Sequence, residues 1–206
     1  TIQAAMADLL LLAPTLVALT LLPGYALLAV TRAWDDWRGW QRFCLAAGIS
    51  LSLYPTLFYF ARWLAPGFAF QPPMWWGLLL LSALVLGVDW WRRRPAFTRP
   101  DAGALAFGAL LLLTFVSRAW VAWEHPYPAW TDSLHHTLAT ALAAEQGRLP
   151  SDLTPYADTP FSLYHLGLYA ITGAVAQAAQ APAHSALLWT AQLLNTYAVL
   201  GVFLVL

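Results

Sequence analysis

Residues 102–120, AGALAFGALLLLTFVSRAW, form an apolar run with a single charge, Arg118, near its end. An α-helix rises about 1.5 Å per residue, so roughly 20 apolar residues cross the ~30 Å hydrocarbon core of a bilayer. Similar apolar runs recur before and after this one. The pattern favours a membrane protein with several helices over a soluble domain.

The composition supports the same interpretation. Of the 206 residues, 60% are hydrophobic and only 10% are charged, whereas soluble domains carry roughly 25% charged residues. Many of the 12 Trp flank the apolar runs, as in the aromatic belts at the two membrane interfaces. The net charge is zero and no basic run is long. We therefore expect membrane lipid, and no nucleic acid, as a partner.

We expect an all-α fold, a polytopic transmembrane helical bundle over 1–206 with about six transmembrane helices plus a short surface helix after Asp132. Pro14 and Pro23 would kink the first helix, which neighbouring helices tolerate in a membrane. The chain stops at Leu206 inside an apolar run, so we expect it to be incomplete at its C-terminus. The predicted transmembrane helices cover residues 6–30, 43–64, 74–91, 102–120, 160–179 and 184–206.

The arginines predict an orientation. Cytoplasmic connections of membrane proteins carry an excess of Lys and Arg. The connections after the first and third predicted helices hold seven arginines, and those after the second and fourth hold three. The long connection 121–159 is therefore expected on the extracytoplasmic side. The two sets are Arg32, Arg38, Arg42, Arg92, Arg93, Arg94 and Arg99 against Arg62, Arg118 and Arg148.

The densest polar cluster is residues 130–137, WTDSLHHT, inside that connection. From 133 to 146 the apolar residues recur at intervals of three and four, which predicts a short helix. Gly147 would end this helix at its C′ position. Thr131 or Asp132 would cap its first turn. A capping carboxylate at the membrane surface can also act as a base or hold a cation, so the two roles are compatible.

Asp132 and His136 are four residues apart and can share one helical face, whereas His135 points about 100° away from His136. The pair suggests ligands for a divalent cation such as Mg²⁺ or Mn²⁺, although no zinc spacing such as His-x-x-x-His occurs. Further donors in the same region are Glu124, His125, Asp152, Asp158 and His165.

Three more side chains carry alternatives. Arg148, in a proline-rich loop, would bind a lipid phosphate or form an ordinary interfacial salt bridge. His165, beside Tyr164, is costly at the edge of a membrane helix unless it is paired or functional. It would bond to a neighbouring helix or, like His184, ligate a porphyrin-type pigment.

Several short motifs occur in a fixed order along most of the chain. Together they resemble the N-terminal part of bacterial membrane proteins of the GT-C glycosyltransferase superfamily, related to protein mannosyltransferases and arabinosyltransferases. Members described only as domains of unknown function are especially similar. The motifs are LLPG (21–24), AGISL (47–51), WTDSLHH (130–136), EQGRLP (145–150), PYA (155–157), YHLG (164–167) and QLLN (192–195).

The resemblance implies a glycosyltransferase that uses a polyprenyl-phosphate-linked sugar at the extracytoplasmic face of the bacterial cytoplasmic membrane, often with a divalent cation. It implies Asp132 as the catalytic residue and a metal ligand. His136, Arg148, Tyr164 and His165 are the predicted substrate-binding residues. The alternative is a non-catalytic helical subunit of a larger membrane complex, with protein partners and with or without a pigment.

Overall fold

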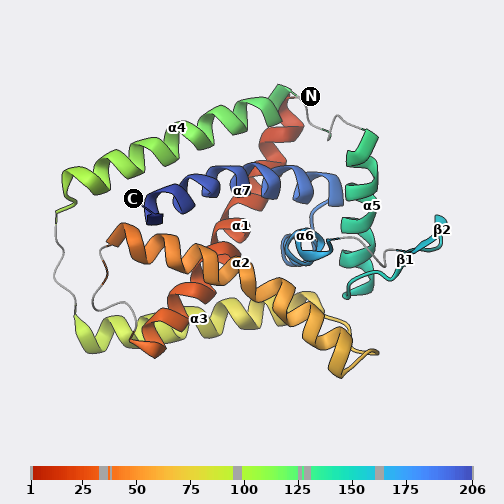
Figure 1. The fold of residues 1–206 in the computed structure, drawn as a ribbon, viewed down its shortest axis with the longest axis horizontal. Coiled ribbons are helices and arrows are strands. Elements are labelled where there is room, and N and C mark those ends of the chain that lie inside the picture. Colours follow the sequence, from red (N-terminus) through yellow and green to blue (C-terminus); the bar gives the residue numbers. More distant parts are fainter. Residues whose placement is uncertain are drawn as a thin grey trace.

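The computed structural model describes residues 2–32, 37, 39–94, 99–124, 127, 131–160 and 165–205. Within these residues the fold is helical apart from one small antiparallel ribbon, which confirms the predicted all-α class (Figure 1). The helices are α1 (Ile2–Thr31), α2 (Gly39–Leu64), α3 (Pro72–Arg93), α4 (Ala102–Glu124), α5 (Thr131–Gln146), α6 (Gly167–Ala179) and α7 (Ala183–Val205), and the strands are β1 (Asp152–Leu153) and β2 (Ala157–Pro160).

Four helices in the described part of the chain are long and apolar enough to cross a membrane: Leu12–Thr31 of α1, and all of α2, α3 and α4. The outward faces of α3 and α4 carry exposed leucines, among them Leu80, Leu84, Leu112 and Leu113. Contiguous apolar surface of this extent is rare in contact with water, whereas lipid is a good solvent for it. The chain therefore has the character of a multi-pass membrane protein.

The predicted count of about six spans is not confirmed. The predicted fifth helix, 160–179, is shorter, because Pro160 ends β2 and α6 begins at Gly167. A helix of 13 residues is about 20 Å long, less than the ~30 Å hydrocarbon core. In Figure 1, α6 is seen end on while α2, α3, α4 and α7 lie along the picture, so α6 runs across these helices.

The last predicted span, 184–206, corresponds to α7, which packs against α4, α5 and α6. In the described part of the chain α7 is not among the four helices that qualify as membrane spans, and Gln192 and Asn195 lie in its middle. An aromatic contact joins α7 to α2. The ring of Tyr197 packs edge to face against Phe43 of α2, with ring centroids 6.1 Å apart.

Pro23 shapes the contact between α1 and α2. A proline inside a helix has no N–H for the carbonyl four residues earlier, which here belongs to Leu19. The buried hydroxyl of Tyr54 in α2 donates to that carbonyl at 2.7 Å. One residue further on, the Gly24 N–H donates to Ser50 Oγ at 2.8 Å, and a Cβ at Gly24 would overlap the Ala46 carbonyl. The two helices therefore approach each other closely around Pro23 and Gly24.

The buried side chain of Gln177 joins α6 to its surroundings. Its Oε1 accepts from Trp75 Nε1 of α3 at 2.6 Å. Its Nε2 donates to the carbonyls of Ala144 in α5, at 2.6 Å, and of Phe70 before α3, at 3.1 Å. Phe70 and Trp75 in turn stack with centroids 4.9 Å apart. Because a buried amide is stable only when its hydrogen bonds are made, Gln177 fixes α5 and α6 on the bundle.

The predicted helix after residue 130 is confirmed as α5, and its predicted end is also confirmed. Gly147 has φ +63°, the left-handed conformation that glycine adopts at a helix C′ position. The Gly147 carbonyl accepts from the Phe70 N–H at 2.7 Å. A Cβ at residue 147 would overlap the Phe70 carbonyl oxygen. Glycine is thus required by conformation and by space.

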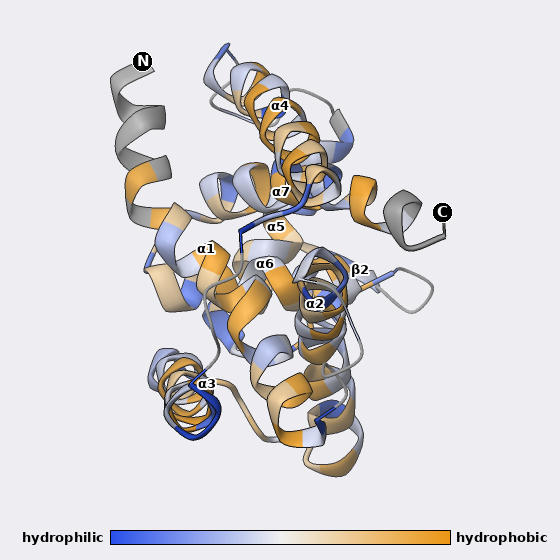
Figure 2. Cartoon of the chain, turned by 90° about the vertical axis from the view of Figure 1, so that its left-hand side faces the viewer, coloured by the Kyte–Doolittle hydropathy of each residue, from blue (hydrophilic) through white to orange (hydrophobic). Residues whose placement is uncertain are grey.

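The helices have two chemically different ends. The C-terminal ends of α1 and α3 lie together, and Arg92 and Arg93 make the last turn of α3 basic. Figure 2 looks along the molecule from this side and shows the near end of α3 as hydrophilic. The opposite end carries α5, α6 and the ribbon (Figure 1). The described arginines at the C-terminal ends of α1 and α3 therefore lie on the side opposite to α5.

Candidate functional site

Three polar side chains meet where α5 and α6 cross. His136 of α5 lies between Asp132, one turn earlier on the same helix, and Tyr169 of α6. Its Nδ1 is 2.6 Å from the Tyr169 hydroxyl, and its Nε2 is 3.4 Å from Asp132 Oδ2. The Asp132 side chain is 73% exposed and that of His136 28% exposed, whereas Tyr169 is buried. The cluster therefore leads from solvent into the bundle.

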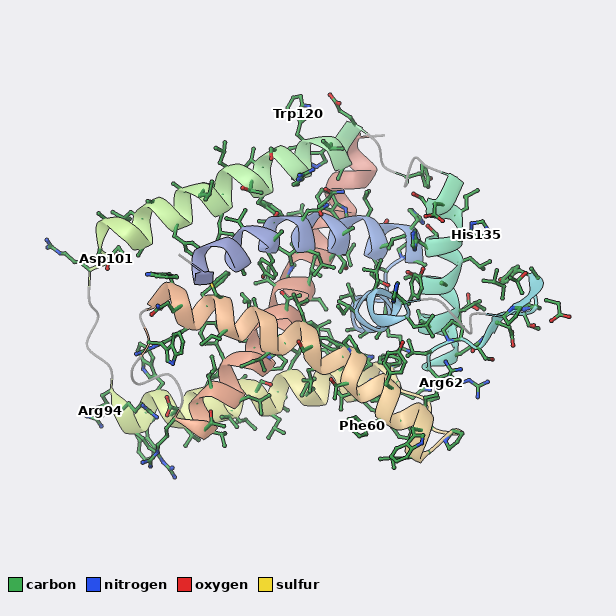
Figure 3. The ribbon with its side chains drawn as sticks, viewed as in Figure 1. Phe60, Arg62, Arg94, Asp101, Trp120 and His135 are labelled. Atoms are coloured by element: carbon green, nitrogen blue, oxygen red, sulfur yellow. The ribbon has the colours of Figure 1, made fainter. Side chains whose placement is uncertain are left out.

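The two contacts constrain the state of the imidazole. In neutral histidine one ring nitrogen donates and the other accepts. If the Tyr169 hydroxyl donates to Nδ1, Nε2 carries the hydrogen and directs it towards the Asp132 carboxylate. This is an arrangement in which a carboxylate orients a histidine ring. His135 is exposed and lies outside the cluster (Figure 3).

Asp132 lies inside the first turn of α5, so the prediction that it is the N-cap is wrong. The helix already begins at Thr131, and the side chain of Thr131 lies outside the described atoms. A carboxylate in the first turn interacts favourably with the positive end of the helix dipole. The same position directs it towards His136, one turn further on. The predicted pairing of Asp132 and His136 on one face is confirmed.

The contact between α5 and α6 continues below the cluster. Thr172 Oγ1 donates to the Leu168 carbonyl at 3.1 Å, so the Thr140 hydroxyl, 2.9 Å away, is the donor to Thr172. At Gly173 a Cβ would come within 2.9 Å of the Ala143 Cβ. Hydrogen-bonded hydroxyls and small residues allow two helices to approach closely in a membrane protein. This close contact holds Tyr169 in place beneath His136.

Arg148 is not part of the cluster. It follows α5 at the end opposite to Asp132, and the 16 residues of α5 measure about 24 Å along the axis. Arg148 instead lines a cavity of about 270 Å³ together with Arg62, Phe68 and Phe70. Figure 3 shows Arg62 near the lower end of α5 and His135 further up the same helix. The predicted site residues thus belong to two separate regions.

The other predicted residues are dispersed. His165 is exposed just before α6, and Tyr164 and His125 lie outside the described residues. His184 packs against Tyr127, with ring centroids 4.9 Å apart. Glu124 Oε1 accepts from Trp120 Nε1 at 3.0 Å, and Asp158 is exposed in β2.

Asp152 has a structural role in the ribbon. Its Oδ1 accepts from the Thr154 N–H at 2.9 Å, and its Oδ2 accepts from the Ser151 hydroxyl at 3.0 Å. Hydrogen bonds to the charged form, chiefly from Thr154, hold the pKa of this carboxyl below its ordinary value. The carboxylate therefore fixes the turn before the ribbon and is already engaged.

A divalent cation does not find a complete set of protein ligands here. Among the described residues no three His, Cys, Asp or Glu side chains come together. Asp132 and His136 offer two donors, and they contact each other. A cation held by protein alone needs more oxygen ligands. The predicted Mg²⁺ or Mn²⁺ ion at Asp132 stays a prediction.

Tyr169 was missed by the sequence analysis. Residues 167–179 contain Tyr169, Thr172, Gly173 and Gln177 in an otherwise apolar segment. Polar and small residues that recur at intervals of three and four, as from 169 to 172 and 173 and on to 177, are the signal of a helix face buried against another helix. That signal identifies which face of α6 is buried against another helix. That this other helix is α5, with His136 against Tyr169, is shown only by the fold.

No protein-family model, curated protein or solved structure matches the chain.

Proposed function

We propose that the chain is a GT-C-like integral membrane protein, all or part of a glycosyltransferase, with its reacting centre at Asp132. The observation that supports it best is the chain of contacts from exposed Asp132 through His136 to buried Tyr169. The Asp132 carboxylate lies on the surface of the bundle, and the buried Tyr169 fixes the ring of the neighbouring His136. The proposed donor is a polyprenyl-phosphate-linked sugar, and the proposed acceptor carries a hydroxyl group.

In this mechanism Asp132 is the general base. The acceptor oxygen forms a bond to the anomeric carbon while its proton passes to the Asp132 carboxylate. The bond between the anomeric carbon and the phosphate oxygen breaks, and its electron pair leaves with the polyprenyl phosphate. Because the Asp132 side chain is exposed, the proton returns to water. His136 is a positioning residue, since its ring is fixed by Tyr169 and directs Nε2 towards the carboxylate.

The arginine distribution supports an extracytoplasmic site. The described arginine-rich connections follow α1 and α3, at the end away from α5, and the positive-inside rule assigns that end to the cytoplasm. The proposed location is the bacterial cytoplasmic membrane with residues 121–159 outside. Tyr164 and His165 stay proposed substrate contacts. Arg148 stays a proposed phosphate ligand, but in the cavity that it shares with Arg62, about 24 Å along α5 from the reacting centre.

The test is sugar transfer by the protein in proteoliposomes, with polyprenyl-phosphate sugars as donors. Asp132→Asn should lower the rate at least 100-fold, within the usual contribution of a general base. Asp158→Asn removes the same charge from an exposed carboxylate of the ribbon and should leave the rate unchanged. Equal rates for the wild type and Asp132→Asn would contradict the assignment of Asp132.

The second candidate is a non-catalytic subunit of a membrane complex. The exposed apolar faces of α3 and α4 favour it, because they would suit further helices as well as lipid. Native mass measurement after extraction in a mild detergent separates the two candidates. A protein that is active as a single chain excludes an exclusively structural role, whereas a stable heteromer without transfer activity supports the subunit, and bound pigment would be visible by its absorbance.

A further inference from the structure

A cavity of about 670 Å³ opens between the C-terminal ends of α1 and α3. Its wall is apolar and includes Val30 of α1 with Leu84 and Val88 of α3. Its rim is basic and is formed by Arg32, Arg92 and Arg93. The cavity lies at the end of the molecule away from Asp132, so the proposed transferase centre does not use it.

The rim has an excess of positive charge. Three arginines and one carboxylate, Asp89, line the cavity, which leaves a net charge of +2. Asp89 Oδ1 accepts from Arg93 Nε at 2.6 Å and so engages one of the three. Arg32 and Arg92 are exposed, and in the described part of the chain neither forms an ion pair. Two guanidinium groups are therefore available, and their planar donors suit a phosphate.

The apolar wall of the cavity suits a ligand that carries a hydrocarbon chain as well as an anionic group. Val30, Leu84 and Val88 are 66%, 58% and 45% exposed, and they belong to two helices that are apolar enough to cross a membrane. In a membrane, such a wall would contact acyl chains while the basic rim would contact headgroups. A ligand with a phosphate and a hydrocarbon chain would cover both, whereas free phosphate would contact the rim alone.

We propose that this cleft binds an anionic phospholipid, with its phosphate at Arg32 and Arg92 and an acyl chain along Val30, Leu84 and Val88. Basic side chains at a membrane surface attract anionic lipids electrostatically. The apolar wall gives the acyl chain a defined place to bind beside them. The bound lipid would contact the C-terminal ends of both α1 and α3. The proposal does not depend on glycosyl transfer.

The test is native mass spectrometry of the delipidated protein with phosphatidylglycerol and phosphatidylcholine of identical acyl chains. Phosphatidylglycerol adducts should exceed phosphatidylcholine adducts at least fivefold. In the double variant Arg32→Gln with Arg92→Gln this ratio should fall to about one. The matched control, Arg94→Gln with Arg99→Gln, removes the same charge from exposed residues near the same end that do not line the cavity, and it should keep the ratio.

Two further measurements distinguish binding of the whole lipid from binding of its headgroup alone. Leu84→Trp places a larger side chain in the cavity without changing the charge of the protein. It should lower the retention of phosphatidylglycerol severalfold. Soluble glycerol phosphate in excess should not displace the lipid. The proposal is overturned by equal binding of the two lipids, by equal losses in the two double variants, or by displacement with glycerol phosphate. Retention unchanged in Leu84→Trp would also overturn the placement of the acyl chain.

Discussion

At the scale of single residues, the structure is held by polar groups whose partners are supplied from another helix. Pro23 leaves the Leu19 carbonyl without its helical donor, and Tyr54 supplies one from α2. Gln177 makes three hydrogen bonds to three different segments. His136 has one partner on its own helix and one on α6. In each case an unpaired buried group would be costly, so the sequence specifies which helices meet.

The pair of Pro23 and Tyr54 gives a direct test. Tyr54→Phe leaves the Leu19 carbonyl buried without a donor, which should lower the free energy of unfolding by about 1–3 kcal/mol. Pro23→Ala restores a backbone N–H at the position that reaches Leu19. The loss caused by Tyr54→Phe should therefore be smaller in the Pro23→Ala background. Thermal unfolding in detergent, followed by circular dichroism, measures the four variants as a double-mutant cycle.

The cycle also has a clear negative outcome. If Tyr54→Phe costs the same with Pro23 and with Ala at that position, the tyrosine hydroxyl does not compensate for the proline. The aromatic ring remains in Tyr54→Phe, so its contact with Trp75, at 5.7 Å between centroids, stays intact. A difference between backgrounds thus reports on the hydroxyl alone.

At the scale of elements, the sequence periodicity predicted where helices form but not how those helices pack against one another. The spacing of apolar residues in 133–146, followed by Gly147, was enough to predict α5 and its end. Residues 167–179 are mostly apolar and almost entirely buried, and a mostly apolar run does not distinguish a membrane span from a short buried helix. The pairing of His136 with Tyr169 joins residues 33 positions apart and depends on the crossing of α5 and α6. Thus Asp132 and His136 were predictable as a pair, but Tyr169 was not.

Gly147 provides a test at this scale. Gly147→Ala places a side chain at φ +63°, which costs about 1–2 kcal/mol by conformation alone, and its Cβ would overlap the Phe70 carbonyl. The free energy of unfolding should fall by at least about 2 kcal/mol. Gly108→Ala is the control, because that glycine lies inside α4 with nothing near its Cβ position. It should be neutral or stabilise by up to about 1 kcal/mol.

A further readout locates the Gly147 effect. Gly147→Ala should weaken the hydrogen bond from the Phe70 N–H to the Gly147 carbonyl, now 2.7 Å. Hydrogen exchange at Phe70 should therefore increase in that variant and stay unchanged in Gly108→Ala. Similar stabilities of the two variants would contradict the requirement for glycine at residue 147.

At the scale of the whole molecule, charge and polarity are separated along the helices. One end carries the cavity rimmed by Arg32 and Arg92, and the other carries α5, α6 and the ribbon. The apolar faces of α3 and α4 lie between them. Such a distribution suits a molecule whose sides face lipid and whose ends face two different aqueous phases. The proposed function requires that the α5 end faces the extracytoplasmic phase.

The orientation can be measured with single cysteines. Cys44 is the only cysteine of the chain and is buried, so it gives a low background. His135→Cys places a thiol on the exposed face of α5, and Arg94→Cys places one at the opposite end, as Figure 3 shows for the native side chains. In intact cells a membrane-impermeant maleimide should label His135→Cys at once. Arg94→Cys should react only after the membrane is permeabilised. The reverse pattern would place Asp132 in the cytoplasm and contradict transfer from an extracytoplasmic lipid-linked sugar, while the lipid cleft at Arg32 and Arg92 would then face outward.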